Sequence, residues 1–281
     1  NVIKAGEVAT AERNKYESDG KVAIIPEGFR VSDKTGETSI NGGLVVYAPD
    51  DSEYVWIPVD GILGENGKTV QNALDGEVVL GRYVFKEDGT IDTNLTPTTL
   101  SEEIIINGAS YIEGLTGKGN TVAKDINAFI DSVRQNGGYY IARFEASRGE
   151  NDKAKSQYNE SVWVNVTQPE AAMACQNLYQ TAQSDLVNSY AWDTAILFIQ
   201  KYGQSTYSRK NSLNTGSKMN TGISEDKQLN IYDMASNVWE YCTQTSLDSN
   251  GPCEGRGGDF LYENNYTSNR GGNSLDYRDI R

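Results

Sequence analysis

The sequence lacks histidine altogether, and this absence removes several kinds of active site. Ser-His-Asp and Cys-His nucleophile pairs, HExxH zinc sites and two-histidine iron sites all need an imidazole. Carboxylate chemistry, cysteine chemistry, a calcium site with oxygen ligands, or a function without catalysis remain open.

Positive charge is scarce as well. The 281 residues include 25 Lys and Arg against 39 Asp and Glu, which gives a net charge of −14. Binding to a phosphate backbone needs clustered cations, so we expect no nucleic-acid partner. Long apolar runs are also missing, since none approaches the roughly 20 residues of a membrane-spanning helix.

Cysteine is limited to three residues. Cys242 and Cys253 flank a short polar stretch, so a disulfide closing this loop is one interpretation, and two separate core thiols are the other. Cys175 lies in an Ala-rich helical pattern, where we expect a small buried side chain.

The hydrophobic patterning that is present predicts an α+β fold rather than a βαβ series. Residues 1–20 are predicted to be a polar helix near an anchor, and 21–281 a single domain. Residues 60–122 are predicted to be an insertion with too few apolar residues for a core of its own. Expected strands cover 22–31, 43–47, 54–59, 139–146 and 163–167, with a hairpin at 82–91; expected helices cover 123–136, 167–179 (Thr167 as its N-cap) and 189–200.

The most specific signal is a pair of motifs near the C-terminus. The first is Asn230-Ile-Tyr-Asp-Met-Ala-Ser-Asn-Val-Trp-Glu240 and the second is Arg256-Gly-Gly-Asp-Phe260. Asp233 is suited to capping a turn and Asn237 to a left-handed position, after which Val238 and Trp239 are expected to enter the core. The two glycines would let the backbone pass close to its neighbours, with Arg256 paired to an acidic side chain.

Together with looser matches upstream, these motifs resemble the formylglycine-generating enzyme (sulfatase-modifying factor) family. That resemblance implies a C-type lectin-like fold with short irregular strands and high coil content. In the family such an asparagine and nearby carbonyls often bind Ca²⁺, so Asn237 and Glu240 are the candidate ligands here; a plain Asx turn is the alternative interpretation. The chain departs from the family's chemistry, because no cysteine follows Arg256 and no histidine is available as an iron ligand.

The segment after Arg256 is composed of Asn, Tyr, Ser, Gly, Asp and Arg, without Lys. Rigid tyrosine rings among small hydrogen-bonding residues are typical of a paratope. In composition and position this segment resembles the variable region of diversity-generating retroelement proteins; a polar loop closing the domain is the alternative. Arg256, Gly257, Gly258, Phe260 and Arg270 would then be framework. The expected exposed contact positions are Asp259, Leu261, Tyr262, Asn264, Asn265, Tyr266, Ser268, Gly272, Asn273 and Tyr277.

These observations predict a non-enzymatic binding protein displayed outside the cell, on a bacterial surface or a phage particle. Its partner would be a protein or glycan on another cell or virus, with a membrane or pilus anchor reached through the N-terminus. No cofactor is required by this interpretation, although Ca²⁺ is one option. Two alternatives stay open: an oxidoreductase of the formylglycine-generating type using Cys242 or Cys253 with a metal, and a Ca²⁺-dependent lectin, for which the usual calcium–sugar motifs are missing.

Overall fold

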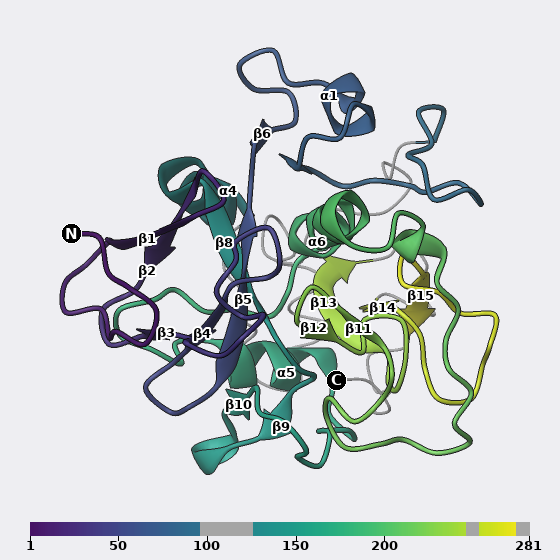
Figure 1. Ribbon diagram of the computed structural model, residues 1–281. Coiled ribbons are helices and arrows are strands. Elements are labelled where there is room, and N and C mark those ends of the chain that lie inside the picture. Colours follow the sequence, from purple (N-terminus) through teal and green to yellow (C-terminus); the bar gives the residue numbers. More distant parts are fainter. Residues whose placement is uncertain (96–125, 246–252, 274–281) are drawn as a thin grey trace.

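Figure 1 shows the computed structural model of the chain, which describes residues 1–95, 126–245 and 253–273. Within these residues the fold is mixed α+β, with few helices and many short strands in small sheets, which confirms the predicted fold class. The helices are α1 (Val70–Leu74), α4 (Ile126–Asn136), α5 (Gln168–Cys175) and α6 (Ser189–Tyr202), with short 3₁₀ turns at Glu150–Asp152 and Tyr207–Arg209. The strands are β1 (Asn14–Ser18), β2 (Lys21–Ile25), β3 (Arg30–Val31), β4 (Val45–Tyr47), β5 (Glu53–Pro58), β6 (Gly61–Ile62), β7 (Val79–Leu80), β8 (Gly138–Ala142), β9 (Ser147–Arg148), β10 (Ala154–Lys155), β11 (Lys227–Gln228), β12 (Ile231–Tyr232), β13 (Glu240–Thr245), β14 (Cys253–Arg256) and β15 (Arg270–Asn273).

The central sheet has the order β3-β4-β5-β8, with each neighbouring pair antiparallel. Side chains along a strand point alternately to its two faces, and β5 uses both. Val55 and Ile57 belong to the core beneath α6, whereas Trp56 belongs to a second core formed with the N-terminal strands. The sheet is therefore buried on both sides, as its nearly continuous apolar run predicts.

Helix α6 is the central helix of the larger core. Its N-cap is Asn188, whose side chain accepts the backbone N–H of Ala191 at 2.9 Å. Trp192, Ile196 and Ile199 are buried along it, as the periodicity predicts. Because the whole stretch from Ala191 to Ile199 is buried, α6 lies inside the molecule, between the central sheet and the C-terminal sheet (Figure 1).

The described part of the predicted insertion, residues 60–95, contributes side chains to this same core. Strands β6 and β7 pair in parallel, and Val79, Leu80 and Tyr83 are buried against α6. The hairpin expected at 82–91 is represented by a bridge between Phe85 and Ile91. The buried apolar residues of this described stretch are therefore part of the main core, and the insertion at 60–122 stays a prediction.

The prediction of a helix at the N-terminus was wrong, whereas its position near an anchor stays a prediction. Residues 14–18 form strand β1, which pairs with β2 through a two-residue turn at Asp19-Gly20. Both turn residues have positive φ, 54° and 69°, the geometry of a hairpin turn whose twist matches its strands. Tyr16 is buried while its neighbours are exposed, a period of two that a helix cannot provide. The Asp-Gly pair therefore marks a hairpin rather than the end of a helix.

Local signals elsewhere were more reliable. Helix α4 ends where Gly137 takes a left-handed φ of 71°, and β8 begins at the next residue. Thr167 caps α5 in a box with Glu170, whose Oε2 accepts the Thr167 N–H at 2.7 Å. The helix stops at Cys175, earlier than expected, and residues 163–167 do not form the expected strand.

None of the described helices is both long and apolar enough to cross a membrane.

The C-terminal sheet has the order β13-β14-β15. Of the two interpretations of Cys242 and Cys253, the structure favours separate thiols, because Cys242 is not in a disulfide. Cys242 is a buried thiol whose Sγ lies 3.7 Å from the carbonyl oxygen of Glu254. In the strand register Cys253 stands opposite Thr245, three residues beyond Cys242, because of an irregularity between Tyr241 and Thr245. The two cysteines are therefore not directly opposite each other in the strand register.

Candidate ligand-binding face

The C-terminal motifs are held on α6 by a buried charge cluster. The Asp193 carboxylate lies 2.6 Å from the Arg256 guanidinium, and both side chains are fully buried. Asp193 also pairs with Arg270 and accepts the backbone N–H of Tyr83 at 2.9 Å. Desolvation, together with the neighbouring Arg256 charge, lowers the pKa of Arg270. Arg256 and Arg270 are thus framework residues, as the sequence predicts.

The glycines after Arg256 permit a close approach of two chain segments. Gly257 has a φ of 79°, and a Cβ on it would lie 2.3 Å from the Met234 carbonyl oxygen. A Cβ on Gly258 would lie 1.8 Å from the Ala235 carbonyl oxygen and 2.0 Å from Ser212 Oγ. No side chain fits these spaces. The Asn230–Glu240 motif and the Arg256–Phe260 motif therefore pack directly against each other.

Beyond Gly258 the chain forms a surface loop of residues 259–266, which we call the rim loop. Asp259 was expected to be an exposed contact, but its side chain is only 9% exposed and organises this loop. Its Oδ1 accepts the N–H groups of Leu261 and Tyr262 at 2.6 and 2.9 Å, and its Oδ2 accepts Asn265 Nδ2 at 2.7 Å. Short acidic side chains commonly bond the backbone two residues on, and this local bonding turns Asp259 inward.

The exposed part of the rim loop matches the prediction more closely. Leu261 is 51% exposed and Tyr262 is 60% exposed, and Asn264 is also exposed. These side chains border an open hollow of about 550 Å³, lined by Asn214, Trp239, Leu261, Tyr262, Glu263, Asn264 and Asn265. Large apolar side chains exposed at the edge of a hollow indicate an interaction site more strongly than exposed polar side chains do.

Trp239, which was expected in the core, is half-buried: it packs against the core cluster that contains Leu186 and Tyr241 and also borders this hollow. Val238 before it is buried, as predicted. Glu263 and Asn214 also border the hollow without having been singled out. Glu263 could have been predicted from the sequence, because it lies between the predicted contacts Tyr262 and Asn264. Asn214 lies 47 residues before Leu261 in the chain, and no local pattern connects them.

The remaining described residues of the predicted face are fixed to the body of the protein. Tyr266 is half-buried, with its ring 3.8 Å from the Arg209 guanidinium carbon. Asn265 accepts the Ser212 N–H at 2.8 Å through its carbonyl oxygen. Ser268 is buried and its hydroxyl donates to the Ser208 carbonyl at 2.8 Å, so the expectation that it is exposed was wrong.

Three predicted contacts lie further along the chain. Gly272 and Asn273 belong to β15, where they pair with Glu254 and Cys253 of β14, and therefore are part of a sheet rather than of the rim loop. Tyr277 lies outside the described residues.

The predicted calcium position at Asn237 is occupied by protein hydrogen bonds. Asn237 has a left-handed φ of 69°, as predicted, and its Oδ1 accepts the Met219 N–H at 2.7 Å. Its Nδ2 donates to the Glu145 carboxylate and to the Met219 carbonyl oxygen. Glu240 is buried at the start of β13. In the described part of the chain no group of three or more Asp, Glu or Cys residues is arranged to hold a metal, and calcium at Asn237 and Glu240 stays a prediction.

The carboxyl groups around Asn237 have altered acidities. Burial, and secondly the charge of Asp233, raises the pKa of Glu145 well above its ordinary value. Burial raises the pKa of Asp233 to about 6 against the opposing hydrogen bonds from Ser224 and Gly222. These groups are inside the protein and support the turn that precedes Trp239, so we assign them a structural role.

No protein-family model matches the chain, and no curated protein matches it. Among solved structures, Treponema denticola variable protein 1 aligns at 13% sequence identity over 95% of this chain and 96% of that chain, with a TM-score of 0.22.

Proposed function

We propose that the protein is a non-enzymatic binding protein that binds a protein or glycan ligand through the rim loop. The observation that carries this proposal is the pair Leu261 and Tyr262, which are 51% and 60% exposed beside the hollow that contains Trp239. Aromatic and aliphatic anchors around a hollow are the side chains that dominate binding free energy in protein interfaces.

The support beneath the rim loop is consistent with this role. Asp259 fixes two backbone N–H groups of the loop, and Trp192 Nε1 donates to the Thr267 carbonyl oxygen at 2.9 Å at its end. A loop anchored at both ends presents its side chains with little loss of conformational entropy on binding. Its outward positions can then be changed without disturbing the buried arginines.

We further propose that the protein belongs with the variable proteins of diversity-generating retroelements, within the C-type lectin-like fold of the formylglycine-generating enzyme family. The two C-terminal motifs and the Asn- and Tyr-rich segment after them support this assignment. Display on a cell surface or phage particle, with an anchor reached through the N-terminus, is part of the same proposal.

A comparison of gene sequences tests the variable character. Sibling strains should differ at Leu261, Tyr262 and Asn264, whereas Arg256, Gly258 and Asp259 should be constant. A reverse-transcriptase gene should lie beside the gene for this protein. Changes spread evenly along the chain would contradict the proposal.

Binding is tested on arrays of purified glycans and extracellular proteins. Tyr262→Ala should weaken every interaction detected for the unaltered protein by about 2 kcal/mol. Tyr158→Ala is the matched control, because Tyr158 is 55% exposed and lies outside the rim loop. Equal losses for the two variants would show that the rim loop is not the binding site.

A further inference from the structure

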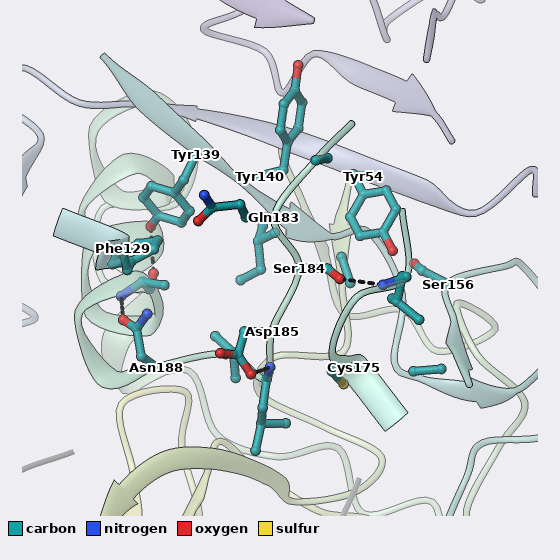
Figure 2. A pocket seen from close by; sticks show the side chains of 18 of the residues that line it. Tyr54, Phe129, Tyr139, Tyr140, Ser156, Cys175, Gln183, Ser184, Asp185 and Asn188 are labelled. Carbon is teal, nitrogen blue, oxygen red and sulfur yellow. Dashed lines mark hydrogen bonds between the residues drawn. The ribbon is translucent and has the colours of Figure 1, made fainter. Parts of the chain in front are cut away.

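A second cavity, of about 820 Å³, lies beside the central sheet along β8, the strand that ends the order β3-β4-β5-β8. All five residues of β8 line it, together with parts of α4, α5 and residues 178–188. Figure 2 shows Tyr139 and Tyr140 of β8 at this cavity, with their rings turned in different directions. Tyr139 packs in the core beneath α6 and Tyr140 against the N-terminal core, so the feature that β8 presents along the cavity is its backbone edge.

The hydrogen bonds to β5 determine which backbone groups of β8 face this cavity. Arg143, directly after β8, donates its backbone N–H to the Glu53 carbonyl oxygen at 3.0 Å. In an antiparallel pair of strands, hydrogen-bonded residue pairs alternate with non-bonded pairs. Ile141 is therefore bonded to β5 again, whereas the backbone N–H and C=O groups of Tyr140 and Ala142 point away from β5. We call these four backbone groups the free edge of β8.

The bonding of the neighbouring residues agrees with this assignment. Trp56, which stands opposite Tyr140 in the register, donates its backbone N–H to the Leu44 carbonyl oxygen at 3.0 Å, on the other side of β5. Within residues 1–95, 126–245 and 253–273, no group is hydrogen-bonded to the free edge. Ala142 is exposed and Tyr140 is partly exposed. A row of accessible, unpaired N–H and C=O groups on a strand is a template for pairing with another strand.

Apolar walls border the free edge on both faces of the sheet. Phe129 and Ile141 pack against the core beneath α6, whereas Phe29 and Tyr54 pack in the N-terminal core, and all four line the cavity. Successive side chains of an added strand would point alternately to these two walls. An extended polypeptide is therefore complementary both to the backbone groups of the edge and to the apolar surfaces beside it.

We propose that the free edge of β8 binds an extended segment of a partner protein as a fifth strand of the central sheet. Main-chain hydrogen bonds to Tyr140 and Ala142 would hold the segment, and its alternate side chains would enter the two walls. A segment that matches the five residues of β8 is about 17 Å long. The net charge of −14 favours a partner segment with an uncharged middle and Lys or Arg at its ends.

The first test is isothermal titration calorimetry of the full chain with the peptide Ac-Lys-Val-Thr-Val-Thr-Val-Lys-NH₂. Val and Thr have high β propensity, and the terminal lysines keep the peptide soluble. The control is the same peptide with N-methyl groups on its five central residues, which removes their N–H donors. We expect one peptide to bind per chain and the N-methylated peptide to bind at least about tenfold more weakly, because each lost hydrogen bond weakens binding.

Variants of the protein locate the binding site. Ala142→Pro removes the N–H that faces the cavity and none of the bonds to β5, and proline is tolerated where an edge strand has no partner. This variant should raise the Kd of the peptide by about tenfold, whereas Ala142→Gly, which keeps the N–H, should bind as the unaltered protein does. Tyr262→Ala should also leave peptide binding unchanged, because the cavity and the hollow at the rim loop share no lining residue. Thermal melting shows whether each variant is folded.

Hydrogen exchange followed by NMR tests the edge directly, without any variant. In the protein alone the amides of Tyr140 and Ala142 should exchange faster than those of Tyr139 and Ile141, which are bonded to β5, and the peptide should slow the first pair. Slow exchange of Tyr140 and Ala142 in the protein alone would mean that a second copy or another part of this chain already covers the edge. That result would overturn the proposal. Absence of peptide binding, equal binding of the N-methylated peptide, or an affinity indifferent to Ala142→Pro in a folded variant would do the same.

Discussion

The Asp193 carboxylate and the Arg256 guanidinium lie 2.6 Å apart with neither side chain exposed to solvent. They connect the first turns of α6 to the strand that precedes the rim loop. A charged pair buried in this way contributes mainly when it is complete, because removing one partner leaves the other uncompensated in a medium of low dielectric. The support of the candidate binding face therefore depends on Asp193.

We predict that Asp193→Asn lowers the free energy of unfolding by about 3–5 kcal/mol, since Arg256 and Arg270 would remain buried without their shared carboxylate. Chemical denaturation of the variant measures this loss. Glu87→Gln is the control, because Glu87 is 90% exposed where it pairs with Arg209, and its removal should leave Tm nearly unchanged. A small effect of Asp193→Asn would show that the cluster is not a stabilising element.

Gly258→Ala should destabilise the protein by at least about 3 kcal/mol, because the added methyl group meets the Ala235 carbonyl and Ser212 Oγ. Gly271→Ala is the matched substitution, since a Cβ there would meet no heavy atom within 4 Å. The measurement is the Tm of each variant. An equal change of Tm in Gly258→Ala and Gly271→Ala would mean that the close approach at Gly258 is not essential.

Asp259→Ala should loosen the rim loop without unfolding the protein. The loop would lose the bonds from Leu261, Tyr262 and Asn265, at a cost of about 1–3 kcal/mol. Hydrogen exchange followed by NMR should show faster exchange of the Leu261 and Tyr262 amides, while the α6 amides keep their protection. Unchanged exchange of those two amides would contradict the organising role of Asp259.

The buried Asp233 predicts a distinct pH dependence. Its pKa is raised to about 6 in the folded protein, above the ordinary aspartate value, so the folded state binds more protons than the unfolded state between about pH 4 and 6. Stability from this group is therefore present at low pH and is lost as the pH rises through 6, by up to about 3 kcal/mol.

Comparison with Asp233→Asn isolates this contribution, because asparagine tolerates the positive φ of 65° at this position. The variant should become more stable relative to the unaltered protein as the pH increases from 4 to 7, measured by denaturation at each pH. A difference that does not vary with pH would show that Asp233 has an ordinary pKa.

Chelation tests the calcium prediction. Because Asn237 already bonds Met219 and Glu145 through both atoms of its amide, we expect EDTA to leave Tm unchanged. A lower Tm in EDTA that CaCl₂ restores and MgCl₂ does not would instead place Ca²⁺ at this turn.

Short-range signals in the sequence determined much of the local structure. Thr167 with Glu170 begins a helix, Gly137 ends one, and Asn237 takes a left-handed turn, because each effect involves only a few neighbouring backbone groups. The Asp19-Gly20 pair carried a hairpin signal of the same kind, although a helix was predicted there. The paired arrangement of Arg256 with a buried acid and the close glycine backbone also followed from the sequence.

Which side chains of the rim loop face outward was decided only by the tertiary structure. Asp259 lies turned inward, where its carboxylate accepts hydrogen bonds from the rim loop, and Trp239 packs partly against a core cluster and partly along the hollow. Asn214 reached the hollow through contacts between segments distant in sequence. Composition constrains the chemistry available to a surface, whereas the direction of each side chain depends on the packing of the whole chain.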